Sequence, residues 1–149
     1  ALDNAISLGD SGTRFKDLYL SGGAYLGGTA AANKLDSYEE GTWTPSAGVG
    51  VTTTSGTFGG IGNYTKIGNL VHIFFRQTAG TISLNSTGYI TGIPFSLDTP
   101  LGFTGSVTDT GPSLLGVSLA WVGNALYFRL TGSATGVTSL IINASYRVT

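Results

Sequence analysis

The chain has 149 residues, with 7 Lys and Arg against 8 Asp and Glu, which gives a net charge of −1. We therefore do not expect the basic surface that sequence-independent nucleic-acid binding needs. Charged residues make up only 10% of the chain, against about 25% in a typical soluble domain, while the mean hydropathy of +0.23 is too high for a disordered low-complexity chain. The absence of cysteine, the single histidine and the lack of any apolar run near ~18 residues exclude disulfide scaffolds, thiolate zinc sites, multi-histidine metal sites within one chain and membrane insertion.

The first 45 residues contain three short apolar stretches, at residues 5–8, 15–20 and 24–26, separated by glycine-rich turns. Strands this short cannot close a sheet of their own, so we expect them to pair with equivalent strands from other copies. Residues 30–40 form the only stretch of helix-compatible composition, and its alanines predict one or two helical turns over residues 29–35. The sequence therefore predicts a stem and connector over residues 1–45. The start at Ala1, in a chain without methionine, indicates a piece of a longer protein.

From residue 46 onward the turn signals recur at the spacing of an all-β domain. Gly68-Asn69 predicts a two-residue hairpin turn, because glycine takes a positive φ and asparagine tolerates one. Around this turn, one predicted face carries Tyr64, Lys66, Val71, Ile73 and Phe75, and the other carries Thr65, Ile67, Leu70, His72, Phe74 and Arg76. Since both faces carry large apolar groups, we expect one to meet the core and the other to meet another surface.

Gly123-Asn124 predicts a second hairpin, in which Trp121 faces Leu126, Leu119 faces Phe128 and Val117 faces Leu130. This wholly apolar face is expected to be core. The final run alternates inward Leu140, Ile142, Ala144, Tyr146 and Val148 with outward Ile141, Asn143, Ser145 and Arg147. Further strands are predicted at residues 49–54, 82–84, 88–92 and 101–108. The seven or eight strands suit an antiparallel, jelly-roll-like β-sandwich, although one sequence does not give the strand order.

Little in the chain points to catalysis. The only imidazole, His72, lies within a predicted strand, and the chain lacks a Gly-x-Ser-x-Gly elbow that would support a Ser–His pair. Three copies of His72 around a three-fold axis would offer a metal site, but a hydrogen-bonded structural role is more common. Glycan cleavage needs two carboxylates at a defined separation. Glu39 and Glu40 are adjacent and would point to opposite faces of a strand, and Asp98 and Asp109 sit in turn-like contexts. The other candidates are Asp36 and, in the N-terminal segment, Asp3, Asp10 and Asp17. We therefore expect no enzyme activity, no metal and no cofactor.

Sugar binding is easier for this chain to host, because it needs exposed aromatic faces with short polar groups beside them. The best candidates are Tyr127 and Arg129 on the outer face of the second hairpin, and Tyr89 and Phe103 near loops. The alternative role for each is packing between subunits. Trp121 is expected to point into the core.

Two stretches carry a family resemblance. Residues 8–23 read Leu-Gly-Asp-Ser-Gly-Thr-Arg-Phe-Lys-Asp-Leu-Tyr-Leu-Ser-Gly-Gly, and residues 33–45 read Asn-Lys-Leu-Asp-Ser-Tyr-Glu-Glu-Gly-Thr-Trp-Thr-Pro. Both resemble recurrent segments of bacteriophage tail fibres and tailspikes, in which Trp is usual at position 15 and an acid is common at position 37. Two shorter matches follow at residues 62–68 and 92–95, whereas residues 96–149 match no motif of that family.

The resemblance implies the C-terminal region of a tail-fibre receptor-binding protein on the virion. It predicts a homotrimer with the end of the fibre shaft at residues 1–45 and a receptor-binding tip at residues 46–149. The expected partners are the rest of the tail fibre and a bacterial surface polysaccharide or lipopolysaccharide, with no nucleic acid and no membrane insertion. A glycan depolymerase acting at subunit interfaces and a purely structural trimerisation knob remain the alternatives.

Overall fold

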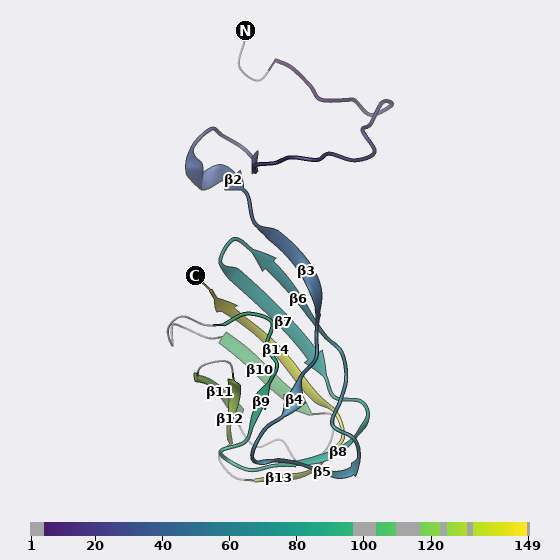
Figure 1. The fold of residues 1–149 in the computed structure, drawn as a ribbon, viewed down its shortest axis with the longest axis vertical. Coiled ribbons are helices and arrows are strands. Elements are labelled where there is room, and N and C mark those ends of the chain that lie inside the picture. Colours follow the sequence, from purple (N-terminus) through teal and green to yellow (C-terminus); the bar gives the residue numbers. More distant parts are fainter. Residues whose placement is uncertain (1–4, 97–103, 110–116, 123–124, 131–132, 149) are drawn as a thin grey trace. The chain divides into compact units, whose positions relative to one another are not determined.

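A computed structural model describes the backbone of residues 5–96, 104–109, 117–122, 125–130 and 133–148, and the side chains of residues 5–96 and 133–148 (Figure 1). The chain divides into two compact units, Ala1–Asp36 and Ser37–Thr149, which are described separately. Among the described residues, no helix has the length and apolar character needed to cross a membrane. The described chain is almost entirely strand and loop, as expected of an all-β protein.

The first unit contains one short antiparallel pair, β1 (Ala24–Tyr25) with β2 (Lys34–Leu35). A single 3₁₀ turn, η1 (Ala31–Asn33), precedes β2, and the backbone becomes extended at Lys34, with φ −83° and ψ 119°. The expected helix over residues 29–35 is therefore reduced to this turn. One turn fixes several dihedral angles for a single hydrogen bond, so helical propensity alone does not extend it.

The second unit is built on a five-stranded antiparallel sheet with the strand order β10-β14-β7-β6-β3 (Figure 1). Its strands are β10 (Thr104–Asp109), β14 (Leu140–Arg147), β7 (Leu70–Arg76), β6 (Gly62–Ile67) and β3 (Tyr38–Trp43). The sequence analysis assigned residues 38–43 to the connector, and that assignment was wrong. These residues form the edge strand β3 and pair with β6 along its whole length.

The predicted hairpin around Gly68-Asn69 is confirmed. Gly68 has φ +57°, and β6 pairs with β7 so that Ile67 lies opposite Leu70 and Thr65 opposite His72. Burial alternates along β7 and again along β14, with Val71, Ile73 and Phe75 buried. The two faces of this hairpin and of the final strand are therefore those that the sequence predicted.

Two smaller sheets complete the second unit. The three-stranded sheet β13-β8-β5 consists of β13 (Ala134–Val137), β8 (Gly80–Leu84) and β5 (Val51–Gly56). The four-stranded sheet β11-β12-β9-β4 consists of β11 (Val117–Val122), β12 (Ala125–Leu130), β9 (Tyr89–Thr91) and β4 (Ser46–Ala47). β5, β8, β9 and β10 match the further strands predicted from sequence, whereas β4 and β13 were not anticipated.

The second hairpin, β11–β12, has the predicted register, with Trp121 opposite Leu126 and Leu119 opposite Phe128. Its side chains lie outside the described part of the structure, so the prediction that one of its faces is core stays a prediction.

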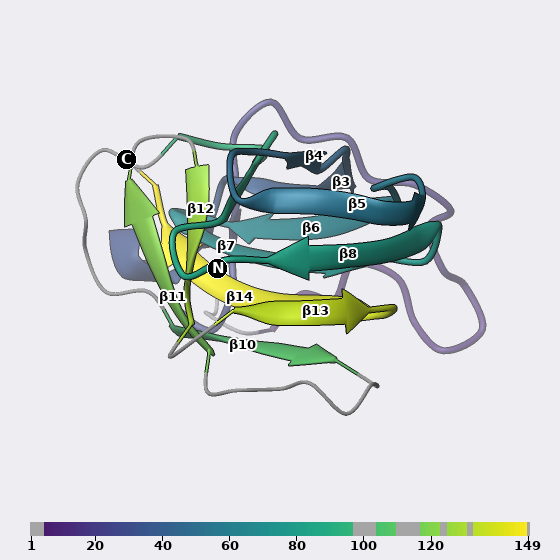
Figure 2. The ribbon, with the colours of Figure 1, turned by 90° about the horizontal axis from the view of Figure 1, so that it is seen from below.

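One hydrophobic cluster forms the described core. Its members come from the inward face of the five-stranded sheet, from β5, β8 and β13, and from β9; Figure 2 shows β5, β8 and β13 in front of the larger sheet. Burial of each large aliphatic or aromatic side chain contributes about 1.5–3 kcal/mol relative to exposure. The cluster consists of Trp43, Val51, Val71, Ile73, Phe75, Ile82, Leu84, Ile90, Ala134, Val137, Leu140, Ile142, Ala144, Tyr146 and Val148.

Candidate functional site

The outward side of the five-stranded sheet, which we call the outer face, is the candidate functional surface of the second unit. Strand alternation turns one set of side chains of β7 and β14 into the core and the other set outward. The outward set consists of Leu70, His72, Phe74 and Arg76 of β7 and of Ile141, Asn143, Ser145 and Arg147 of β14.

One end of the outer face is apolar. Tyr38 of β3 lies opposite Ile67 of β6, and Ile67 lies opposite Leu70 of β7, so the three side chains form a row across the sheet. They are 55%, 51% and 46% exposed, and Phe74 is 38% exposed. Exposure of such an apolar row to water is unfavourable in a lone chain. Contact with another surface would bury the row and is therefore favoured.

The next row of the outer face is polar. Glu40, Thr65, His72 and Ser145 follow one another across β3, β6, β7 and β14. His72 Nδ1 shares a hydrogen bond of 3.0 Å with Ser145 Oγ. The sequence analysis gave a hydrogen-bonded structural role as the more common one for a lone histidine such as His72, and this bond between side chains of neighbouring strands agrees with that role.

The geometry around His72 and Ser145 does not build a nucleophilic site. β7 lies between β14 and β6, and β14 lies between β10 and β7, so the backbone N–H groups around both residues are used in the sheet. An oxyanion needs N–H donors that are free to reach it. Within the described residues, the pair therefore acts as a cross-strand hydrogen bond.

The structure brings together two of the four predicted sugar-binding residues. Tyr127 of β12 lies directly opposite Tyr89 of β9, and Arg129 occupies the second position beyond Tyr127. Tyr89 is half-buried, and its ring lies against Gly48, where an added Cβ would come within 2.3 Å of the ring carbon Cε2. The side chains of Tyr127 and Arg129, and all of Phe103, lie outside the described part of the structure. Their role in sugar binding stays a prediction.

A second polar group of residues, which the sequence analysis missed, lies along β3 and β6. Tyr64 donates a hydrogen bond of 2.5 Å to Glu39 Oε1, and this bond raises the pKa of the Tyr64 phenol because it stabilises the neutral form. The Tyr64 ring meets Phe95 edge to face, with centroids 5.1 Å apart. Lys66 Nζ donates to Ser37 Oγ over 2.6 Å. The feature of the sequence that could have pointed to this group is Gly41. An added Cβ at this position would come within 2.6 Å of the Tyr64 hydroxyl, so only glycine leaves room for the ring.

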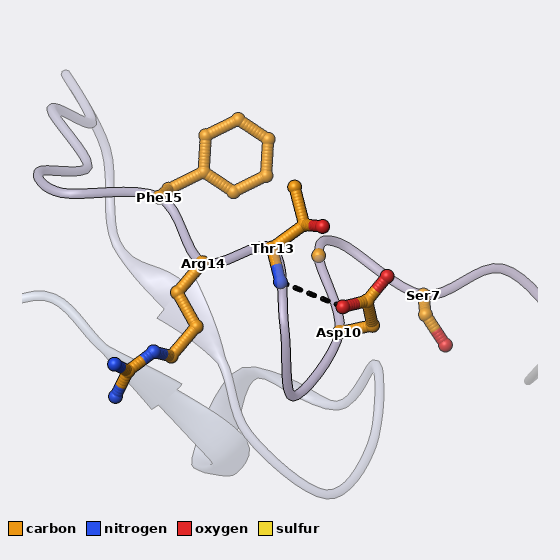
Figure 3. A pocket seen from close by; sticks show the side chains of 6 residues that line it. Ser7, Asp10, Thr13, Arg14 and Phe15 are labelled. Carbon is orange, nitrogen blue, oxygen red and sulfur yellow. Dashed lines mark hydrogen bonds between the residues drawn. The ribbon is translucent and has the colours of Figure 1, made fainter.

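The first unit has an open hollow lined by Ser7, Gly9, Asp10, Thr13, Arg14 and Phe15 (Figure 3). Asp10 Oδ1 accepts hydrogen bonds from the backbone N–H groups of Gly12, at 2.8 Å, and Thr13, at 2.7 Å. These bonds hold the pKa of the Asp10 carboxyl below its usual value. Because all the lining residues come from one short exposed stretch, the hollow is the inside of a local turn.

Within the described residues, no group of three or more His, Asp or Glu side chains is arranged to hold a metal ion. Comparisons of the chain with protein-family models, with curated proteins and with solved structures gave no match.

Proposed function

We propose that this chain is the receptor-binding tip of a bacteriophage tail fibre. In this proposal three identical chains associate, the first unit forms the end of the shaft, and the second unit is a two-layer β-sandwich that binds a glycan on the host surface without cleaving it. The sequence resemblance of residues 8–45 motivates the proposal, and the physical state of the first unit supports it.

The observation that carries the proposal is the exposure of the first unit. None of residues 5–36 is buried, although the segment is rich in large apolar side chains. A piece of this size lies below the length at which a chain builds its own core without staples or partners. The exposed apolar residues include Ile6 (87%), Leu8 (73%), Phe15 (65%), Leu18 (65%) and Tyr19 (89%).

Association of copies removes this surface from water. Burial of each of these side chains in a contact between copies would contribute about 1.5–3 kcal/mol. Charge repulsion between copies is weak, because the whole chain has a net charge of −1. A fibre shaft, in which identical strands from three chains lie together, is an arrangement that uses such a segment.

The second unit has the side-chain chemistry that glycans require. Its outer face carries the exposed aromatic groups of Tyr38 and Phe74 and the short polar groups of Thr65, Asn143 and Ser145. Aromatic faces pack on sugar C–H surfaces, and hydroxyls and amides hydrogen-bond with sugar hydroxyls. Several weak sites on one trimer, and several fibres on one virion, bind together more tightly than one site alone.

Native mass spectrometry at micromolar concentration tests the association. We expect a species of about three times the chain mass of 15.2 kDa. A stable, folded species of 15.2 kDa would overturn the trimer.

Incubation of the protein with a panel of bacterial surface polysaccharides tests the activity. Binding without new reducing ends supports the proposal, whereas new reducing ends identify a depolymerase. An absence of binding to every glycan favours a structural knob.

A further inference from the structure

We propose that the outer face binds acidic glycans, which contain uronic or similarly anionic sugars, along a basic stripe formed by Arg147, His72 and Arg76. This inference rests on the proposed glycan-binding function and names the ligand class and the surface.

The three basic side chains lie on one face and along one pair of strands. His72 and Arg76 belong to β7, and Arg147 belongs to the neighbouring β14, where it lies opposite Leu70. All three are exposed in the described structure. At about 3.4 Å per residue, the register places Arg147 and Arg76 about 20 Å apart along the strands, with His72 between them. Several linked sugars are needed to cover this length.

Among the side chains that the structure describes, the acid on the outer face is Glu40 of β3, and the strand β6 separates β3 from β7, so none of these side chains neutralises the stripe directly. Arg76 is oriented by its Nε atom, which donates to Ser139 Oγ over 3.1 Å. That bond leaves the terminal nitrogens of the guanidinium to face a ligand, and these nitrogens match the geometry of a carboxylate.

The groups between the cations suit a sugar polymer. Ser145, Asn143 and Phe74 occupy the outer face between the ends of the stripe. On β10, Thr104 and Ser106 occupy the positions opposite Ser145 and Asn143. An acidic glycan presents carboxylates, hydroxyls and C–H surfaces. The outer face offers basic side chains for the carboxylates, hydroxyls and an amide for the sugar hydroxyls, and an aromatic ring for the C–H surfaces. A neutral glycan leaves the arginines without partners.

The experiment measures binding of the full chain to immobilised polysaccharides by biolayer interferometry. The anionic probes are polygalacturonate and alginate, and the neutral probes are dextran and pullulan. We expect binding to the anionic probes and not to the neutral ones, and a loss of affinity of about tenfold or more between about 50 mM and about 300 mM salt, since exposed charges are screened.

Substitutions locate the binding on the outer face. Arg76→Gln and Arg147→Gln are each expected to weaken binding to polygalacturonate about fivefold, the upper range for an exposed ion pair. Lys16→Gln removes the same charge from the exposed first unit and is expected to leave binding unchanged. Glu40→Gln removes the acid of the outer face and is expected to strengthen binding by up to about twofold. Native mass spectrometry of each variant verifies that it is folded and keeps the oligomeric state.

Three results would overturn the inference while leaving the proposed function intact. They are binding to dextran or pullulan as tight as to polygalacturonate, anionic binding unchanged in both arginine variants, and a change of oligomeric mass in these variants, which would make the stripe a contact between copies. Binding of a single-stranded oligodeoxynucleotide as tight as that of polygalacturonate would also overturn it, because charge alone would then explain the binding. Absence of binding to any saccharide would overturn both the inference and the proposed glycan recognition.

Discussion

Tyr146 is a single buried ionisable group that makes the stability of the fold depend on pH. The side chain is 1% exposed, and its hydroxyl donates to the backbone oxygen of Phe95 over 3.5 Å. Burial raises the pKa of this phenol above its ordinary value of 10.0, because the charged phenolate is poorly solvated in the core. The sequence predicted that Tyr146 points inward, because it continues the alternation of the final strand. Its contact with Phe95 joins residues 51 positions apart, which periodicity does not predict.

The buried phenol predicts a loss of stability at alkaline pH. A group whose pKa is raised by folding gives stability that is complete below its pKa in the unfolded chain, near 10, and that falls as the pH rises above this value. For Tyr146 the expected loss is up to about 1.4 kcal/mol for each pH unit above 10. Urea unfolding followed by circular dichroism at pH 9, 10 and 11 measures this slope.

Tyr146→Phe is the matched control for the alkaline measurement, since it keeps the ring and removes the ionisable hydroxyl. The variant is expected to lose less stability between pH 10 and pH 11 than the unsubstituted chain. Equal slopes for the two proteins would show that Tyr146 is not the group responsible.

At the scale of the element, the local sequence pattern was sufficient to predict those strands in which apolar and polar residues alternate strongly. The β6–β7 hairpin follows from Gly68-Asn69 and from apolar residues at every second position, and the same alternation identifies β14. β3 was missed because Glu39, Glu40 and Gly41 interrupt any apolar pattern. Its pairing with β6 depends on contacts far along the chain. As a result, the outer-face residues of β6, β7 and β14 could be predicted, whereas Tyr38 and Glu40 of β3 could not.

Packing of β3 against β6 predicts an unusual sensitivity at Gly62. Trp43 of β3 lies opposite Gly62, and an added Cβ at Gly62 would lie 2.1 Å from Nε1 of the buried indole. The ring cannot move away easily, because it is 5% exposed and packs against Phe75 with centroids 5.9 Å apart. Gly62→Ala is therefore expected to lower the free energy of unfolding by about 2–3 kcal/mol, as overpacking does elsewhere.

Gly59→Ala is the matched control for Gly62→Ala, and both are measured by urea unfolding. An added Cβ at Gly59 meets its nearest neighbour, the Cβ of Ala79, at 4.0 Å, which is an ordinary contact. Its effect on the free energy of unfolding is expected to stay within about 0.5 kcal/mol. A Gly62→Ala effect as small as that of Gly59→Ala would show that β3 is not packed tightly on β6.

At the scale of the whole molecule, the two units differ in how much of their surface they bury. The second unit has its own core, whereas the described part of the first unit buries no side chain. Composition suggested this difference, because short apolar stretches between glycines cannot close a sheet. In our proposal these stretches are covered by other chains. The sequence of one chain does not show which residues of different copies lie opposite one another. For this reason the sequence predicted that the stem needs partner chains but did not predict how its strands pair.

Association through the first unit predicts that thermal stability depends on protein concentration. When unfolding also separates the copies, mass action raises the midpoint of unfolding as the concentration increases. We expect the midpoint to rise between about 1 and about 100 μM protein.

Leu18→Ser tests whether the first unit makes the contact between copies, because the side chain of Leu18 is 65% exposed in the single chain. At fixed concentration the variant is expected to lower the midpoint by about 2–4 °C for each kcal/mol by which it weakens the association. Val49→Ser, at a side chain 72% exposed in the second unit, is expected to leave it nearly unchanged. A midpoint independent of concentration, together with equal midpoints for the two variants, would mean that the apolar surface of the first unit faces water.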